Sequence, residues 1–136
     1  MIIAVRYFSK GGNTRKLAEA IAQEVGTEAR DVSEDLTEKA DMLFLANSVY
    51  GGLYDPAVGR FLERNAAKIG CVVNFSTSCT GRSTYAGVKA LAGKLGVKVS
   101  DKHFVCKGHF WIFHKGRPDE NDLAQARRFA ADAVKG

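Results

Sequence analysis

Ser9-Lys10-Gly11-Gly12-Asn13-Thr14 joins a continuous apolar run, residues 2–8, to an amphipathic helical pattern that begins at Arg15. The two glycines let the backbone turn sharply with its N–H groups pointing inward, the hydroxyls add donors, and a helix N-terminus attracts anions. The turn therefore predicts a phosphate-binding loop, although an ordinary tight turn before a helix uses the same residue types. It matches neither G-x-x-x-x-G-K-[ST] nor G-x-G-x-x-G, which argues against a P-loop NTPase and a conventional dinucleotide-binding dehydrogenase.

Short apolar runs alternate with amphipathic helical patterns along the rest of the chain. The runs at 2–8, 42–46 and 71–75 are nearly continuous, as strands buried on both faces of a parallel sheet require, and 27–32 and 103–107 are weaker edge candidates. Apolar residues recur at helical spacing in four places: Leu17, Ile21 and Val25; Val58, Phe61 and Leu62; Val88, Leu91 and Leu95; and Leu123, Ala126, Ala130 and Ala133. This strand-helix order, repeated five times, predicts a doubly wound three-layer α/β domain, with residues 33–41 forming either a short helix or a loop.

Helix boundaries carry their own signals. Asp55 followed by Pro56 predicts an N-cap with proline at the first helical position, and Gly26 and Gly70 are expected stop signals after helices. The last helix opens with three acidic residues that suit its positive end: Asp119, Glu120 and Asp122.

Length and composition predict one cytoplasmic domain. A chain of 136 residues can bury roughly two-thirds of its unfolded surface, and we expect a single domain over residues 1–136. No apolar run approaches the roughly 20 residues of a membrane span, and the first residues lack the features of a signal peptide. Cys71, Cys79 and Cys106 are widely spaced, so we expect small buried side chains rather than a disulfide framework or a zinc site.

Three loops of the predicted sheet are candidates for ligand binding. In a doubly wound sheet, ligands bind beyond the carboxyl ends of the strands, where the strand order reverses. The loops after the first, third and fourth strands are residues 9–14, 47–54 and 76–81; each is rich in glycine or hydroxyl groups, and the second carries Tyr50 and Tyr54. A phosphate at the first loop, an aromatic ring system across the second and polar heteroatoms met by the third describe flavin mononucleotide (FMN).

These motifs resemble those of the short-chain flavodoxins, and the likeness covers the whole chain. The family's phosphate loop, [ST]-x-[ST]-G-x-T, is matched by Ser9, Gly12, Asn13 and Thr14 and departs at Gly11, where a hydroxyl residue is usual. The resemblance implies a flavodoxin-like fold with a five-stranded parallel sheet in the order 2-1-3-4-5, and FMN as the cofactor. It also implies that the cofactor contacts come from the three loops: Ser9, Lys10, Gly11, Gly12, Asn13, Thr14, Ser48, Val49, Tyr50, Gly51, Gly52, Ser76, Thr77, Ser78, Cys79 and Gly81.

Some of these residues have more than one interpretation. Tyr50 is the candidate for stacking on the flavin ring, and Tyr54 is a weaker one, but a loop tyrosine often packs over the end of a sheet instead. Gly51–Gly52 resembles the glycine peptide that rotates in the family when the flavin is reduced, although a plain tight turn needs glycine too. Cys79 is expected to be a spectator, since no neighbouring base would activate its thiol.

The histidines and a late aromatic stretch suggest no metal site. His103, His109 and His114 match no metal-binding spacing. Residues 110–113, Phe-Trp-Ile-Phe, are interpreted mainly as core or as a cover over the end of the sheet, with an exposed partner or substrate surface as the alternative.

Charge separates this chain from the typically acidic electron-transfer flavodoxins. Its formal net charge is +5, and residues 56–118 carry 11 basic and 2 acidic side chains, against 6 and 9 in residues 1–55. Solvated helix faces explain most such charge, but a basic surface around a flavin would favour an acidic partner or an anionic substrate. No helix-turn-helix, zinc finger or stacking platform accompanies the charge, so no nucleic-acid partner is expected.

Three functions stay open at this point. The leading hypothesis is an FMN-binding carrier of electrons between partner proteins, with no catalytic residue of its own. The second is an FMN-dependent reductase or oxidase of a quinone, porphyrinogen or other small molecule, with Arg82, Tyr85 and residues 110–113 lining a substrate pocket. The third is a flavin-free interaction module, suggested by Gly11 and the basic surface. A receiver domain fits poorly, because no acidic pair follows the first strand.

Overall fold

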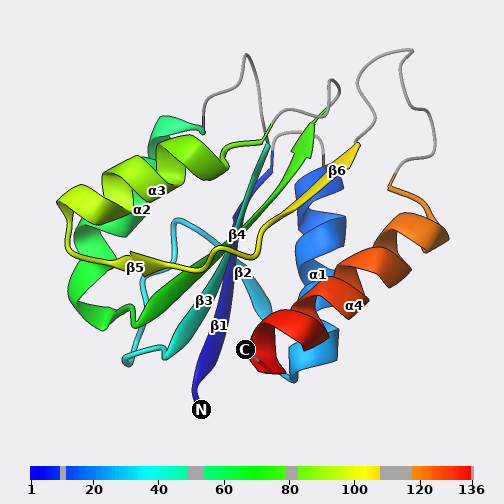
Figure 1. Ribbon diagram of the computed structural model, residues 1–136, viewed down its shortest axis with the longest axis horizontal. Helices are drawn as coiled ribbons and strands as arrows, with labels where there is room; N and C mark the ends of the chain where they lie inside the picture. Colours follow the sequence, from blue (N-terminus) through cyan, green and yellow to red (C-terminus); the bar gives the residue numbers. More distant parts are fainter. Residues whose placement is uncertain (10–11, 49–53, 79–82, 108–117, 136) are drawn as a thin grey trace.

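Within the described part of the chain, six parallel strands form one sheet (Figure 1). The computed structural model describes residues 1–9, 12–48, 54–78, 83–107 and 118–135. The strands are β1 (Ile3–Phe8), β2 (Ala29–Asp31), β3 (Met42–Ser48), β4 (Cys71–Ser78), β5 (Lys98–Val99) and β6 (Phe104–Lys107). Their order is β2-β1-β3-β4-β5, and β6 also pairs with β4. The predicted parallel sheet and its 2-1-3-4-5 order are therefore confirmed.

The last position of the sheet differs from the prediction, because two short strands share it. β5 pairs with the start of β4, where Val99 lies opposite Val72, and β6 pairs farther along, where Phe104 lies opposite Phe75. Residues 100–103 therefore lie opposite residues 73–74 alone, and the additional residues form a bulge between β5 and β6. The strand predicted at 103–107 is found at 104–107, and a strand as short as β5 leaves no periodicity that could predict it.

Helices cover both faces of the sheet, which confirms the three predicted layers. α1 (Asn13–Val25) and α4 (Glu120–Lys135) lie on one face, and α2 (Pro56–Asn65) and α3 (Tyr85–Lys94) lie on the other (Figure 1). The short 3₁₀ helix η1 (Ala66–Lys68) follows α2. None of the helices in the described ranges is long and apolar enough to cross a membrane.

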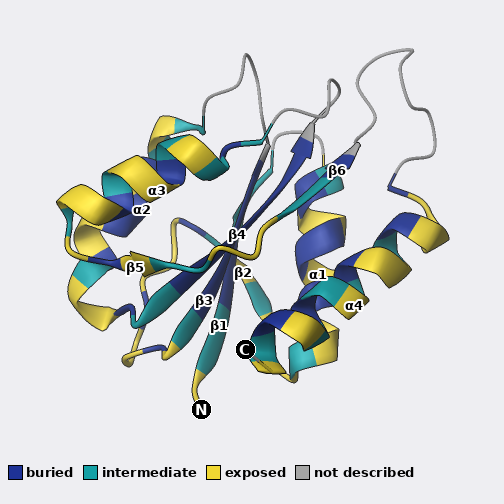
Figure 2. Cartoon of the chain, in the orientation of Figure 1, coloured by how far each residue is buried: buried dark blue, intermediate teal, exposed yellow. Residues whose placement is uncertain are grey.

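Each face of the sheet has its own apolar core. Phe44 and Phe75 belong to the core under α1 and α4, and Leu43 and Leu45 belong to the core under α2 and α3. Figure 2 shows the result, with the buried residues on the sheet and on the inward sides of the helices. Consecutive residues of a strand face opposite layers, so the nearly continuous apolar runs of the sequence are what a sheet covered on both faces requires.

The helix ends follow the capping signals of the sequence. The Asp55 carboxylate accepts the Ala57 N–H at 2.9 Å, so Asp55 caps α2 as predicted. Gly26 ends α1 in the left-handed conformation, with a φ of 78°. At the start of α4, the side chains of Asp119 and Asp122 each accept the backbone N–H of the other at 2.9 Å.

Gly70 was expected to end a helix, but the structure shows a different reason for glycine here. Another backbone segment passes too close to Gly70 for a side chain. Ala40 and Gly70 belong to two segments that run side by side, with the Gly70 N–H donating to the Ala40 carbonyl at 2.8 Å. A Cβ atom on Gly70 would lie 2.6 Å from the carbonyl oxygen of Asp41. Glycine is therefore needed for the close approach of two backbone segments.

The link from β2 to β3 is a loop, which is one of the two alternatives predicted for residues 33–41, so strand and helix alternate four times rather than five among the described residues. The structure describes all of residues 33–41, and they form turns and bends with no helix. The Arg6 guanidinium reaches this loop from β1 and donates to the carbonyls of Glu34, at 2.9 Å, and Asp35, at 3.3 Å. From α2, the Asn65 Oδ1 atom accepts the Leu36 N–H at 2.9 Å. Side chains thus supply the hydrogen bonds that a helix would otherwise satisfy within itself.

Candidate functional site

The carboxyl ends of β1, β3 and β4 lie side by side at one edge of the sheet, which we call the carboxyl edge. Phe8 at the end of β1 lies opposite Asn47 in β3, and Asn47 lies opposite Ser76 in β4. The chain order changes direction between β1 and β3, which is the place where doubly wound sheets bind ligands. The three loops predicted to bind the cofactor therefore start from adjacent strand ends (Figure 1).

Ser9 and Gly12 shape the first of these loops. The Ser9 Oγ atom accepts the Gly12 N–H at 2.9 Å, and Gly12 has a φ of 87°, which glycine adopts without strain. Among the described residues, no side chain caps the start of α1, and its first turn holds Arg15 and Lys16 but no acidic residue. Cations at the positive end of a helix oppose its dipole, so this turn is electrostatically suited to an anion.

Thr14 and Thr77 join the first loop to the third. Their hydroxyl oxygens lie 2.7 Å apart, and both side chains are buried. Thr14 follows the half-buried Asn13 in the first turn of α1, and Thr77 is the penultimate residue of β4. The contact fixes the N-terminus of α1 against the end of β4, so the first and third loops start from a rigid frame.

A second buried polar group lies under the carboxyl edge on the side of α2 and α3. The Asn47 Nδ2 atom donates to Asn74 Oδ1 at 3.4 Å, and Asn74 Nδ2 donates to Thr84 Oγ1 at 3.0 Å. Thr84 immediately precedes α3, so the chain of hydrogen bonds runs from the end of β3 through β4 to the start of that helix. It holds the segments on either side of the third loop together.

Two atoms in this region have no hydrogen-bond partner among the described residues. They are Asn47 Oδ1 and Ser76 Oγ, and both residues are fully buried. Asn47 and Ser76 are cross-strand neighbours on the same face of the sheet. A buried polar atom without a partner costs about 1–3 kcal/mol, so this pair indicates a place for a polar ligand group or an ordered water.

Sequence reasoning placed Asn47 in the second candidate loop but not among the cofactor contacts, and it missed Asn74 and Thr84 as parts of the site. The signal for Asn74 was present, because this amide interrupts the apolar run at residues 71–75. An amide inside a strand that is buried on both faces needs a hydrogen-bond partner, and such partners gather at functional edges of the sheet.

Half of the predicted cofactor contacts lie outside the described residues, and their roles stay predictions. Ser48 and Ser78 are the last residues of β3 and β4, so both strands extend two to three residues into the segments predicted as loops, 47–54 and 76–81. The predicted contacts outside the described ranges are Lys10, Gly11, Val49, Tyr50, Gly51, Gly52, Cys79 and Gly81. Arg82, His109, His114 and residues 110–113 also lie outside them.

Tyr54 packs between two helices, α2 and α3, and not over the end of the sheet as the alternative interpretation had it. A Cβ atom on Gly59 of α2 would lie 3.3 Å from the Tyr54 ring, and one on Gly87 of α3 would lie 3.1 Å from it. Two glycines on facing helices therefore make room for this ring. Tyr54 joins the core under α2 and α3, where it supports the start of α2.

Tyr85 and His103 form an aromatic pair at the start of α3. Their ring centroids lie 4.0 Å apart with an angle of 14° between the planes, and the Lys89 Nζ atom lies 5.7 Å from the Tyr85 ring. Tyr85 opens α3, and His103 is the last residue of the bulge before β6. In the described residues, His103 belongs to no group that could hold a metal ion.

The two described cysteines occupy different environments. Cys106 is buried in the core under α1 and α4, as predicted. Cys71 is only half-buried at the start of β4, and loss of solvation raises the pKa of its thiol. A raised pKa keeps the Cys71 thiol protonated and unreactive.

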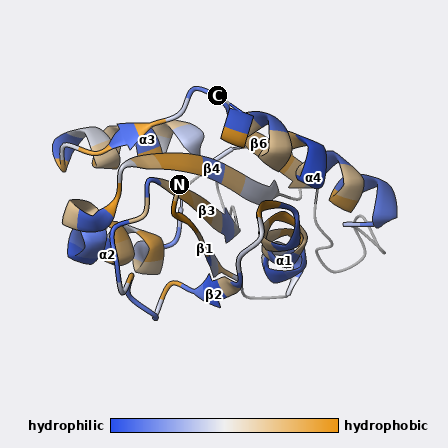
Figure 3. Ribbon diagram, turned by 90° about the horizontal axis from the view of Figure 1, so that it is seen from below, coloured by the Kyte–Doolittle hydropathy of each residue, from blue (hydrophilic) through white to orange (hydrophobic). Residues whose placement is uncertain are grey.

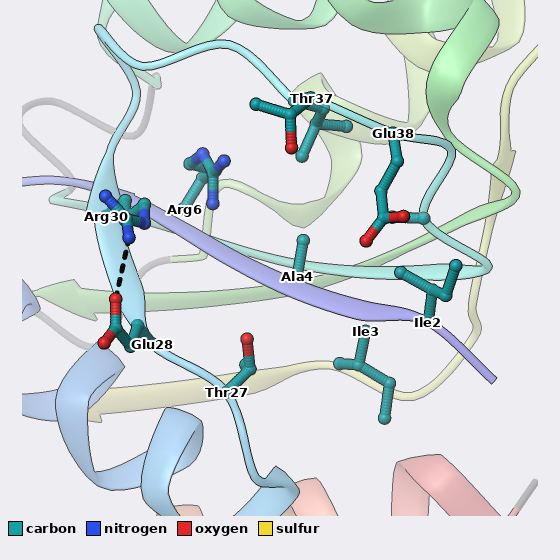
Figure 4. A pocket seen from close by; sticks show the side chains of 11 residues that line it. Ile2, Ile3, Ala4, Arg6, Thr27, Glu28, Arg30, Thr37 and Glu38 are labelled. Carbon is teal, nitrogen blue, oxygen red and sulfur yellow. Dashed lines mark hydrogen bonds and ion pairs between the residues drawn. The ribbon is translucent and has the colours of Figure 1, made fainter.

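A cleft of about 300 Å³ lies away from the carboxyl edge, between β1, β2 and the loop 33–41 (Figure 4). Figure 4 shows Glu28 and Arg30 on one side of the cleft, joined by an ion pair of 2.7 Å. Arg6 is 7% exposed, and burial lowers its pKa while the Glu34 carboxylate opposes that shift. Because the Arg6 guanidinium donates to loop carbonyls, we assign it to holding the loop rather than to binding a ligand.

Comparison with known proteins agrees with the observed fold. A model of the flavodoxin domain family matches residues 4–111, and no curated protein matches the chain significantly. A flavodoxin from the domain Archaea superposes with a TM-score of 0.77 at 16% identity, covering 99% of this chain and 97% of that one. Oxidised flavodoxin 1 from Bacillus cereus gives 0.76 at 17% identity, covering 99% and 98%.

A third solved structure is a flavoprotein from Lactobacillus acidophilus in complex with FMN. Its TM-score is 0.64 at 15% identity, and the match covers 78% of this chain and 92% of that one. At these identities the three structures demonstrate a shared fold, and the family assignment rests on the sequence match over most of the chain. This chain belongs to the flavodoxin domain family.

Proposed function

We propose that this chain binds FMN at the carboxyl edge of its sheet and carries electrons between partner proteins. The observation that carries the proposal is the pair of buried atoms without described partners, Asn47 Oδ1 and Ser76 Oγ, beside the strand ends where the three loops start. The FMN ring offers both donors and acceptors, so these atoms fit it directly or through an ordered water. Membership of the flavodoxin domain family supports the same cofactor. When bound, FMN supplies one- and two-electron chemistry.

The start of α1 is the proposed site of the FMN phosphate. Gly12 has the left-handed conformation that lets a loop bend back on itself, and Arg15 and Lys16 stand in the first turn without an acidic neighbour there. A phosphate dianion would offset the unfavourable position of these cations at the positive end of the helix. The proposed phosphate contacts are Ser9, Lys10, Gly11, Gly12, Asn13 and Thr14.

The second and third loops are the proposed sites of the flavin ring. Tyr50 is the proposed stacking partner, and Gly51–Gly52 is the proposed peptide that changes orientation with the redox state. The contacts proposed for the ring are Ser48, Val49, Tyr50, Gly51, Gly52, Ser76, Thr77, Ser78, Cys79 and Gly81.

The chemical character of the site favours a carrier over an enzyme. Asp122, at the start of α4, is buried and accepts the Asp119 N–H; the other buried polar side chains near the carboxyl edge, among the described residues, are those of asparagine, serine and threonine. None of these amide and hydroxyl groups titrates near neutral pH, so they can hydrogen-bond a cofactor but cannot serve as a general acid or base. Such a site leaves the redox chemistry to the cofactor, as a carrier requires.

A stopped-flow experiment separates a carrier from an FMN-dependent reductase of a quinone or porphyrinogen. Reduced, FMN-loaded protein is mixed with ferricyanide, a one-electron acceptor, and turnover with NADH or NADPH and menadione is measured in parallel. We expect one rapid, stoichiometric oxidation by ferricyanide and no sustained consumption of either nicotinamide. Sustained nicotinamide-dependent reduction of the quinone would identify an enzyme. Failure to retain FMN would leave the flavin-free interaction module.

A further inference from the structure

Opposite edges of the sheet carry opposite charge. β2 is one edge strand, and β5 and β6 lie at the other edge; Figure 3 shows β2 and β6 on opposite sides of the sheet. The β2 edge and its loop carry the acidic residues Glu28, Asp31, Glu34, Asp35 and Glu38 besides the basic Arg30 and Lys39, whereas the charged side chains of α3, β5 and the bulge are Lys89, Lys94, Lys98 and Lys102 with the single acid Asp101. Acidic side chains therefore predominate at the β2 edge of the sheet, and basic side chains predominate at the edge formed by β5 and β6.

The cations near the end of α2 have a role inside the fold. Arg64 donates to the Asp35 carboxylate at 2.9 Å and to the Val32 carbonyl at 3.0 Å. Lys68 donates to the Leu36 carbonyl at 3.0 Å. These contacts hold the loop between β2 and β3, so the positive charge of α2 is explained by the structure itself.

The cations of α3 and β5 have no comparable role. Lys89, Lys94 and Lys98 are exposed, and within the described ranges no carboxylate forms an ion pair with them. Lys102 is exposed in the bulge and donates to the backbone carbonyl of Asp132 at 3.2 Å. α3 and β5 pack side by side (Figure 1). We call the following surface the basic edge: Tyr85, Lys89, Lys94, Lys98, Lys102 and His103.

The stacked pair of Tyr85 and His103 gives the basic edge a rigid aromatic centre. The rings lie 4.0 Å apart, His103 is exposed, and Tyr85 is partly exposed. Aromatic side chains that are already held in place lose little conformational entropy on binding, and they are enriched in protein interfaces. Tyr85 opens α3, which begins where the chain returns from the loop after β4. Tyr85 therefore lies at the end of α3 nearer the carboxyl edge, and His103 lies next to Phe104, which pairs with Phe75 in the middle of β4.

The backbone of the basic edge is unsuited to pairing with a strand of another protein. Four residues, 100–103, stand opposite two residues of β4, so the ladder of the edge strand is interrupted. A bulge of this kind blocks regular extension of a sheet. Recognition at this edge therefore falls to the side chains.

We propose that an acidic electron-transfer protein docks on the basic edge, with Tyr85 and His103 at the centre of the contact and the lysines around them. The inference rests on the proposed carrier function, since docking near the start of α3 brings a partner beside the FMN site. Complementary charge would steer the encounter and orient the partner, and salt would weaken both effects.

An NMR titration of the flavin-free protein tests the docking surface. The probe is an oxidised, small acidic [2Fe–2S] ferredoxin added at low salt, whose cluster broadens the amide signals of nearby residues. We expect broadening at Tyr85, Lys89, Lys98 and His103, and binding that weakens as salt is added. The double substitution Lys89→Gln with Lys98→Gln should weaken binding by roughly fivefold. The control is Lys39→Gln with Arg128→Gln, which removes the same charge from exposed positions elsewhere and should change binding by less than about twofold.

Four results would overturn the proposal: no binding at low salt, equal weakening by the two double variants, broadening confined to other surfaces, or tighter binding of a short DNA duplex by the same lysines. Because the flavin-free protein is used, a failure here leaves the FMN site untouched. A failure of FMN to bind would instead remove the carrier function on which the inference rests, so the two failures are distinguishable.

Discussion

Among single residues, Gly70 is fixed by the close approach of two backbone segments. A Cβ atom there would lie 2.6 Å from the Asp41 carbonyl oxygen, whereas one on Gly93, an exposed position in α3, would meet no atom within 4 Å. We expect Gly70→Ala to lower the free energy of unfolding by about 2 kcal/mol. Gly93→Ala should raise it by about 0.5–1 kcal/mol, because alanine loses less entropy in a helix than glycine. Urea unfolding measures both, and equal midpoints would contradict the prediction.

Ser76 allows structure and cofactor binding to be separated. Its hydroxyl is buried without a described partner, so Ser76→Ala removes no described hydrogen bond and should leave the unfolding free energy of the flavin-free protein unchanged or slightly higher. The same variant should bind FMN roughly fivefold more weakly, because the ring or its bridging water loses a contact. Ser100→Ala, in the bulge, is the control for FMN affinity. A Ser76→Ala protein that unfolds more easily yet binds FMN normally would contradict the role of Ser76 in FMN binding.

Residues that shape a local turn could be predicted from the sequence, whereas residues that form buried hydrogen bonds between distant positions could not. Gly12 and Ser9 are predictable, because a positive φ and a short hydroxyl contact are local features of the turn. The contact of Thr14 with Thr77 and that of Asn74 with Thr84 join positions far apart in the chain or across a loop. No spacing rule within one segment can predict such pairs.

Among the elements, the loop from β2 to β3 depends most on side chains. Asn65 accepts the Leu36 N–H at 2.9 Å and donates to Asp35 Oδ1 at 3.1 Å and to the Phe61 carbonyl at 2.9 Å. We expect Asn65→Ala to lower the free energy of unfolding by about 2 kcal/mol, because it leaves the buried Leu36 N–H unsatisfied and removes the hydrogen bonds of the amide to Asp35 and Phe61. Chemical unfolding checks this, with Asn121→Ala at an exposed position of α4 as the control. A similar small effect for both variants would show that the loop does not depend on the hydrogen bonds of Asn65.

The same loop predicts a pH effect at Asp35. Hydrogen bonds from Asn65 and then Arg64 lower the pKa of this carboxylate below its ordinary value of 3.8. A depressed pKa in the folded state stabilises the protein above the ordinary value, and this contribution is lost as the pH falls through the folded pKa. NMR titration should therefore find that the Asp35 pKa rises toward its ordinary value in Asn65→Ala. Identical pKa values in the two proteins would exclude the amide as the cause.

Elements were predictable in proportion to their length. β1, β3 and β4 are long enough for an apolar run, and α1 to α4 are long enough for helical periodicity, so all of these follow from the sequence. The β2–β3 loop was ambiguous, because Arg6 and Asn65 reach it from distant elements. β5 has two residues and is held by its pairing with β4 rather than by its own propensity.

For the whole molecule, the charge of +5 should affect the potential of bound FMN. The second electron makes the bound flavin an anion, which a positive field stabilises. We expect the second reduction potential to be less negative than in acidic flavodoxins at low salt, with the difference narrowing as salt is added. The double substitution Lys89→Gln with Lys98→Gln should make the second reduction potential more negative. Spectroelectrochemical titration at two ionic strengths measures the effect, and a potential indifferent to salt would refute it.

Titration of the flavin-free protein with FMN, followed by quenching of flavin fluorescence, decides whether the carboxyl edge is a flavin site. Riboflavin, which lacks the phosphate, is the matched ligand. We predict saturable quenching by FMN at micromolar concentrations or below, and binding of riboflavin weaker by roughly tenfold or more, because the start of α1 then lacks its anion. No saturable quenching by FMN would contradict the proposed site, and equal affinity for the two flavins would contradict the phosphate loop.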